Sequence, residues 1–151
     1  MCKWCVGGCA HAARGSMKPQ AEALKARTKK FALDALAFLD AVPPTGSNRR
    51  IVWQLSDAGT SVGANYRAAC RSRSDAEFAA KIGQVLEESD ESLFWLEICE
   101  ARSLGERTTR ARLLREADEL TAIFAASSNT IRAKLERAKS SNQRINLKSE
   151  I

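Results

Sequence analysis

Apolar residues recur along this chain at alternating steps of three and four positions, in four long stretches separated by short turn signals. The stretches cover residues 19–41, 47–71, 74–103 and 108–138. Such steps place the apolar side chains on one face of an α-helix, because the helix makes about 3.6 residues per turn. The pattern therefore predicts an almost wholly helical protein with four helices of roughly five turns or more.

Local signals divide these helices from one another. Pro43 and Pro44 end the first helix, because proline lacks the N–H that a continuing helix needs. Ser74 and Glu77 form a capping-box pattern, serine at the N-cap and glutamate three residues later, which starts the third helix. Gly105 marks the turn into the fourth.

Two glycines lie one turn apart inside the second helix. Gly59 and Gly63 each lower helix propensity by up to about 1 kcal/mol. We expect their small size to let a neighbouring helix approach closely, which would compensate for that loss.

We divide the chain into a bundle domain at residues 18–138, an N-terminal tail at 1–17 and a polar C-terminal tail at 139–151. The N-terminal tail carries a C-x2-C-x3-C-x-H pattern of Cys2, Cys5, Cys9 and His11. These ligands could hold zinc, but they are crowded and no second ligand pair accompanies them. The alternative is an irregular tail that precedes a more conventional start at Met17.

Charge is unevenly distributed along the chain, whose net charge is +6. Residues 74–100 hold eight acids and one lysine, a net charge of −7, which leaves +13 on the rest. This asymmetry predicts a basic exterior that faces an anionic partner, although ordinary solvated helix faces would give a similar pattern. No apolar run approaches the roughly 18 residues of a membrane span, so we expect a cytoplasmic protein without membrane contact.

The sequence shows no catalytic constellation. There is no paired nucleophile and base and no phosphate-binding loop. The acids of the third helix cannot form a di-metal carboxylate site, which needs histidines from the helices, because the single histidine is His11. We therefore predict a protein that is not an enzyme, without a cofactor and without a metal.

The residues that we expect to bind partners are exposed cations and apolar side chains that lie beside the core stripes. Candidate nucleic-acid contacts are Arg49, Arg50, Arg67, Arg71, Arg73, Arg107, Arg110 and Arg112. Arginines suit phosphate, and the start of the third helix also favours anions. The alternative is that Arg67, Arg71 and Arg73 pair with Glu77, Glu87 or Glu91, within or between subunits. Trp53, Phe94, Trp95 and Ile98 fall beside the main apolar stripes and predict an oligomer interface.

Three motifs together resemble a known family. They are the run DAGTSVGAN at residues 57–65, the run RSRSDAEF at 71–78, and the segment ESDES at 88–92. The set resembles the bacterial four helix bundle protein family, which includes proteins encoded by intervening sequences in 23S ribosomal RNA genes and the accessory variability determinant of diversity-generating retroelements. The likeness covers about residues 24–138. Many members have Asn-x-x-Glu-Gly where this chain has Asn65-Tyr66-Arg67-Ala68-Ala69.

The resemblance implies an antiparallel up-down four-helix bundle that assembles as a homopentamer. Its retroelement branch further implies binding to nucleic acid and to a reverse transcriptase. We therefore expect a non-enzymatic oligomeric scaffold that binds RNA or DNA through a basic surface. The alternative is a protein-interaction module, or an intervening-sequence protein of unknown role, that does not bind nucleic acid.

Overall fold

A computed structural model describes residues 19–149 of the chain, and the side chains of residues 19–141. Four helices make up this part: α1 (Pro19–Asp40), α2 (Asn48–Ala69), α3 (Asp75–Ala101) and α4 (Arg107–Ser149). The prediction of four long helices is confirmed. The N-terminal tail and its Cys/His pattern lie outside the described residues.

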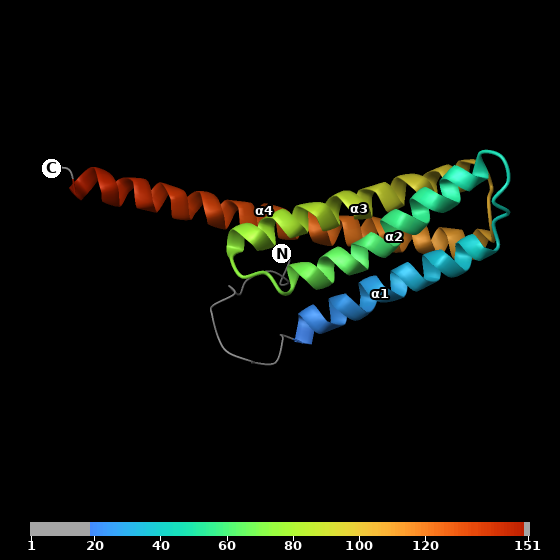
Figure 1. Cartoon of the computed structure of the whole chain (residues 1–151), viewed down its shortest axis with the longest axis horizontal. Coiled ribbons are helices and arrows are strands. Elements are labelled where there is room, and N and C mark those ends of the chain that lie inside the picture. The colour runs from blue at the N-terminus through green and yellow to red at the C-terminus, as the bar shows by residue number, and fades with distance from the viewer. Residues whose placement is uncertain (1–18, 150–151) are drawn as a thin grey trace.

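The helices form an up-down bundle in which each packs against the next along the chain (Figure 1). α2 packs against α1 and α3, and α3 packs against α2 and α4. The contact between α1 and α4, which closes the bundle, is the sparsest of the four. Among the helices of residues 19–149, none combines the length and the apolar content needed to cross a membrane.

The core consists of the apolar stripes that the three-and-four spacing predicted. Each helix contributes large side chains that are at most 2% exposed: Phe31, Leu55, Val62, Ile82, Val85, Leu96, Leu113, Leu120 and Phe124. Complete burial of one such side chain stabilises a fold by about 1.5–3 kcal/mol relative to leaving it in water. The pattern therefore located the core correctly in all four helices.

Gly59 and Gly63 lie where α2 crosses α1. A Cβ atom at Gly59 would be 3.5 Å from the Cβ of Ala35, and one at Gly63 would be 3.4 Å from the carbonyl oxygen of Thr28. A methyl group at either position would therefore make an ordinary van der Waals contact with α1. The two helices lie close together here, as expected, but with room for a methyl group, so the packing does not require glycine.

The start of α3 has the predicted cap. The Ser74 hydroxyl accepts a hydrogen bond from the Glu77 backbone N–H at 3.1 Å. The Glu77 carboxylate in turn accepts from the backbone N–H of Arg73 at 2.9 Å. The bond to Ser74 is that of a capping box, whereas the Glu77 carboxylate bonds to the residue before the N-cap instead of to Ser74 itself.

Helix α4 is longer than the sequence predicted. We expected it to end near Ala138 and to be followed by a frayed polar tail, but it continues to Ser149. Residues 139–149 contain neither proline nor glycine, and the Ser140 and Ser141 hydroxyls bond to backbone carbonyls one turn earlier, those of Glu136 and Arg137. Polarity alone does not end a helix, and this segment projects beyond the bundle in Figure 1.

Candidate nucleic-acid interface

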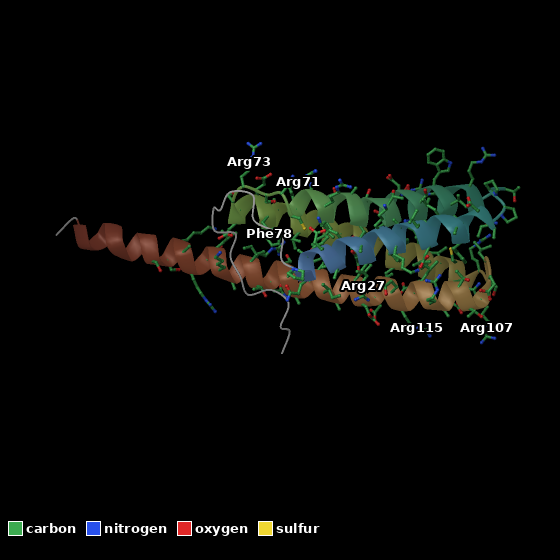
Figure 2. The ribbon with its side chains drawn as sticks, turned by 90° about the horizontal axis from the view of Figure 1, so that it is seen from below. Arg27, Arg71, Arg73, Phe78, Arg107 and Arg115 are labelled. Atoms are coloured by element: carbon green, nitrogen blue, oxygen red, sulfur yellow. The ribbon has the colours of Figure 1, made fainter. Side chains whose placement is uncertain are left out.

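The eight arginines predicted to bind nucleic acid do not form one surface. Arg49 and Arg50 lie at the start of α2 and Arg107 at the start of α4. These two helix starts share one end of the bundle, where Arg102 donates to the side-chain oxygen of Asn48 at 3.3 Å. Arg67, Arg71 and Arg73 lie at the opposite end, about 30 Å away at the rise of an α-helix (Figure 2).

We call Arg67, Arg71 and Arg73 the basic cluster. All three side chains are exposed. Within residues 19–141 their guanidinium groups form no ion pair and no hydrogen bond with a carboxylate. Figure 2 shows Arg71 and Arg73 extending away from the helices. Their charge is therefore available to an anion from solution.

Two of the three alternative partners of the basic cluster, Glu77 and Glu91, have other contacts, whereas Glu87 forms no ion pair among the described side chains. Glu77 caps α3 and lies 3.7 Å from the ammonium of Lys81. Glu91 accepts hydrogen bonds from Gln54 at 3.3 Å and from the Trp95 indole N–H at 3.1 Å. Pairing of the cluster within one subunit, which the sequence left open, is not observed among the described residues. Pairing between subunits stays a prediction.

The N-terminus of α3 is not a free anion site, contrary to expectation. Ser74 and Glu77 already accept hydrogen bonds there. The first turn also carries Asp75, whose carboxylate pairs with Lys134 at 2.6 Å. Because acidic side chains already complement the positive end of the helix, a phosphate group at this end must be bound by arginine side chains.

Arg110 is a structural residue, and we withdraw it from the candidate set. The residue is only 4% exposed, and its side chain pairs with Glu100 of α3. Its Nη1 donates to the carbonyl oxygens of Leu104 at 2.6 Å and Gly105 at 3.2 Å. The guanidinium thus ties the turn between α3 and α4 together, and the bond from Arg110 holds the pKa of the Glu100 carboxyl below its usual value.

Arg112 also has an internal partner. It pairs with Asp34 of α1, which Lys30 contacts at 2.7 Å. Burial raises the pKa of Asp34, but the hydrogen bonds from Lys30 and Arg112 together outweigh burial, so the pKa lies below its usual value. Arg112 therefore contributes to the contact between α1 and α4 and is a weaker candidate for phosphate.

A second set of ion pairs closes the same contact. Arg27 of α1 donates to Glu116 at 2.6 and 2.9 Å and to Glu119 at 2.5 Å, both on α4. The hydrogen bond with Glu116 raises the pKa of Arg27 most, which keeps the guanidinium charged. The sequence pattern did not predict the ion pair between Arg27 and Glu116, because the two residues are about 90 positions apart.

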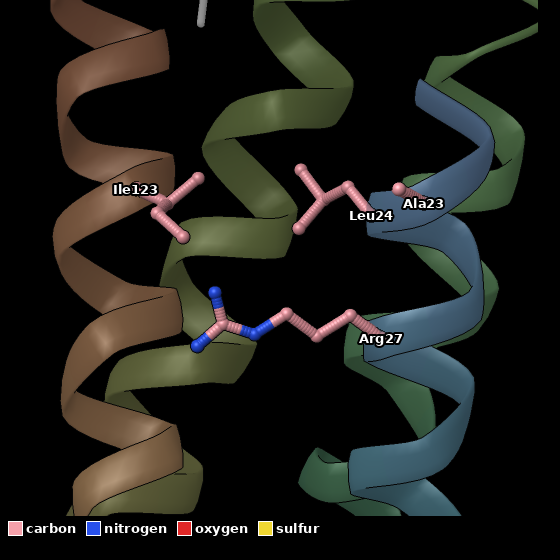
Figure 3. Close-up of a pocket in the computed structure, with 4 residues that line it drawn as sticks. All are labelled: Ala23, Leu24, Arg27 and Ile123. Carbon is pink, nitrogen blue, oxygen red and sulfur yellow. The ribbon is translucent and has the colours of Figure 1, made fainter. Parts of the chain in front are cut away.

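A small pocket lies beside Arg27, between α1 and α4 (Figure 3). It has a volume of about 160 Å³ and is lined by Ala23, Leu24, Arg27 and Ile123. Its single charged group is already paired with Glu116 and Glu119. No group of three or more potential metal ligands occurs in the part of the chain that the structure describes. The pocket therefore offers no nucleophile, base or ligand set.

The predicted interface residues differ in exposure. Trp53 is 72% exposed and Phe94 is 49% exposed, which is unusual for side chains of this size. Trp95 and Ile98 are partly buried and pack against the core. The surplus apolar surface that motivated the oligomer prediction is present, whereas the oligomer itself stays a prediction.

The comparison with known families covers most of the bundle, from within α1 to the middle of α4. A sequence profile described as "23S rRNA-intervening sequence protein" matches residues 23–126, which include α2, α3 and most of α1. The chain belongs to this family. The resemblance based on the three motifs is thereby confirmed.

One solved structure shares the fold. It is the crystal structure of a protein of unknown function from the S23 ribosomal protein family of Bacteroides thetaiotaomicron, with 23% sequence identity and a TM-score of 0.61. The likeness covers 70% of this chain and 97% of that one. None of the curated proteins compared with the chain matches it.

Proposed function

We propose that this protein is a non-enzymatic, self-assembling scaffold that binds RNA or DNA through the basic cluster. The observation that carries the proposal is the exposure of Arg67, Arg71 and Arg73 without an acidic partner among the described residues. Three guanidinium groups with this freedom can each bind a phosphate, often through two hydrogen bonds. The resemblance to retroelement accessory proteins further supports nucleic acid as the ligand, and a reverse transcriptase as a protein partner.

Binding of this kind would depend little on base sequence. Contacts from arginine to phosphate fix position without reading bases. The basic cluster contains no aromatic side chain, and the neighbouring Tyr66 ring is buried against Phe124 with centroids 5.4 Å apart. Among the described residues the neighbouring Phe78 also packs against the core, so the basic cluster offers charge rather than an exposed ring, and the proposed contact is electrostatic.

Assembly would strengthen such a contact. One cluster supplies three charges, and a contact with so few phosphates is weak at physiological salt. Repeating the cluster in every subunit makes later contacts intramolecular and raises the overall affinity by multivalency. The proposed scaffold thus needs both the basic cluster and self-association.

A charge-neutralising variant tests the proposal. We expect Arg67→Gln/Arg71→Gln/Arg73→Gln to weaken binding to a fluorescent 30-nucleotide RNA or DNA and to flatten its salt dependence. On a duplex, the log–log slope should fall by about 0.9 for each phosphate that the variant no longer neutralises. The matched control is Arg49→Gln/Arg50→Gln/Arg107→Gln, which removes the same charge at the other end of the bundle. We expect the control to lose less affinity than the cluster variant.

Three outcomes would contradict the proposal. Wild-type protein that does not bind nucleic acid at about 50 mM salt refutes it outright. Equal losses in both variants would show only an effect of net charge. Dissociation of the assembly in the cluster variant, measured by sedimentation, would mean that these arginines join subunits.

The alternative function is a protein-interaction module that uses the acidic surface of α3. Glu87 and Glu88 of α3, and Asp57 of the neighbouring α2, form no ion pair within residues 19–141. A packed protein interface loses less affinity with salt than a phosphate contact does, so the salt titration separates the two functions.

A further inference from the structure

Side chains of α2 and α3 form a surface that is both acidic and aromatic. We call it the acidic–aromatic face and define it by Asp57, Glu87, Glu88, Glu91, Phe94 and Trp95. Gln54 bridges to Glu91 at 3.3 Å, and Glu91 accepts from the Trp95 indole at 3.1 Å, so the two helices are linked here. The Phe94 and Trp95 rings stack edge to face with centroids 5.1 Å apart.

This face has an uncompensated negative charge. Its four carboxylates take part in none of the ion pairs formed within the described side chains. Partial burial, with Glu91, Asp57 and Glu87 nearby, raises the pKa of Glu88. Four carboxylates without a counter-charge, beside two aromatic rings, are suited to lysine and arginine, which can pair with carboxylates and also lie over aromatic rings.

The chain itself carries a matching basic segment. We call residues 136–149 of α4 the α4 arm. Its sequence holds four cations, Arg137, Lys139, Arg144 and Lys148, and one carboxylate, Glu136. The arm follows the last buried residue of the helix, Ile131, and projects beyond the bundle in Figure 1.

The arm cannot reach the acidic–aromatic face of its own subunit. The ion pair of Lys134 with Asp75 fixes the point where α4 leaves the bundle, beside the start of α3. Glu87 lies about 18 Å back along α3 from that point, whereas the arm continues in the opposite direction. A contact between the two surfaces therefore has to join two copies of the chain.

We propose that the acidic–aromatic face is the docking site for the α4 arm of a second copy. The two surfaces differ, so the contact is heterologous and runs from head to tail. Such contacts close into a ring when the rotation between subunits allows it. Docking would also cover the carboxylates that repel nucleic acid, while the basic cluster stays exposed.

Charge reversal of each surface, alone and together, tests the docking. The face variant is Asp57→Lys/Glu87→Lys/Glu91→Lys, at three exposed positions. The arm variant is Arg137→Glu/Lys139→Glu/Arg144→Glu. A combined variant carries both sets, and Arg49→Glu/Arg50→Glu/Arg107→Glu is the control that changes the same charge as the arm variant at the opposite end. Sedimentation velocity across protein concentrations gives the assembly state, and circular dichroism verifies the fold.

We expect half of the chains to be assembled only at a protein concentration at least about tenfold higher than for the wild type, in the face variant and in the arm variant alike. We expect an equimolar mixture of the two, and the combined variant alone, to assemble as the wild type does, because each restores opposite charges across the contact. The control should assemble normally.

The proposal is overturned if wild-type protein is monomeric at micromolar concentration. It is equally overturned if both single-surface variants assemble normally, or if neither the mixture nor the combined variant regains assembly. A monomeric wild type would also contradict the self-assembly in the proposed function. Failure of the charge reversals alone would leave its nucleic-acid binding untouched, because these measurements contain no nucleic acid.

Discussion

A guanidinium group has five N–H donors and remains charged at every physiological pH, and its surroundings decide what it does. Arg110 directs its donors at the Glu100 carboxylate and at the carbonyl oxygens of Leu104 and Gly105. Its burial is tolerated because those acceptors replace water. Arg71 has the same side chain but lies exposed, so its donors remain available to a ligand.

Gly105 and Gly46 provide a matched pair of substitutions to alanine. Both have positive φ angles, +65° and +54°, which cost a non-glycine residue about 1–2 kcal/mol. A Cβ at Gly105 would also lie 2.3 Å from the buried ring of Phe38, whereas nothing lies within 4 Å of one at Gly46. Overpacking adds about 1–3 kcal/mol, so we expect Gly105→Ala to lower the thermal midpoint about twice as much as Gly46→Ala. Equal shifts in calorimetry would show that the Phe38 ring moves aside at little cost.

At the scale of elements, α1 joins the bundle in two different ways. Against α2 it packs closely at Gly59 and Gly63. Its contact with α4 is sparser and includes ion pairs, from Arg27 to Glu116 and from Arg112 to Asp34. Partly exposed ion pairs of this kind contribute about 0–1 kcal/mol each, so α4 holds α1 less firmly than α2 does.

The start of α4 should be sensitive to acid. The Glu106 carboxylate accepts hydrogen bonds from the backbone N–H groups of Thr108 at 2.7 Å and Thr109 at 2.6 Å, which lower its pKa from 4.5 to about 2. A carboxyl group whose pKa is lower in the folded state than in the unfolded state stabilises the fold at pH values above the unfolded pKa. This stabilisation is lost as the pH falls from 4.5 toward 2, because the carboxylate then becomes protonated. Glu106→Gln should therefore reduce stability at pH 7, and the difference from wild type should vanish in that acidic range.

Urea unfolding at several pH values measures this difference. The control is Glu97→Gln on the exposed surface of α3, which removes a carboxylate without removing a helix cap. A difference between Glu106→Gln and wild type that persists at pH 2 would show that the carboxylate charge is not what stabilises the helix start.

Most helix boundaries were predictable because their signals are local. Proline ends α1, Ser74 and Glu77 begin α3, and the three-and-four spacing locates the core. The C-terminal limit of α4 was missed because no residue there stops a helix. The candidate site was only partly predictable, since nothing near Arg110 or Arg112 in sequence distinguishes either from Arg71; their partners come from other helices or from folded turns.

For the whole molecule, charge is arranged by region. Exposed arginines lie at both ends of the bundle, and the carboxylates of the acidic–aromatic face lie between them on α2 and α3. A phosphate backbone that follows the long axis would meet repulsion in the middle. Nucleic acid is therefore expected to contact one end of each subunit, unless another surface covers the acidic region.

The α4 arm should be dispensable for folding of a single bundle. Among the described side chains of α4, the last buried one is Ile131 and Leu135 is half-buried, whereas residues 136–141 are exposed. An isolated helical segment of this length is marginal in water, so the arm adds little stability of its own. We expect a chain that ends at Leu135 to keep its thermal midpoint within about 3 °C of the wild-type monomer, which corresponds to roughly 1 kcal/mol at this size.

The comparison requires monomeric protein, because assembly stabilises folded chains by mass action. Measuring both proteins over a dilution series separates the two effects: the midpoints should converge at low concentration and diverge in favour of the full chain as concentration rises. A truncated chain that melts more than about 5 °C lower even in the dilute limit would show that the arm supports its own bundle. Convergence without later divergence would show that the arm makes no contact between copies.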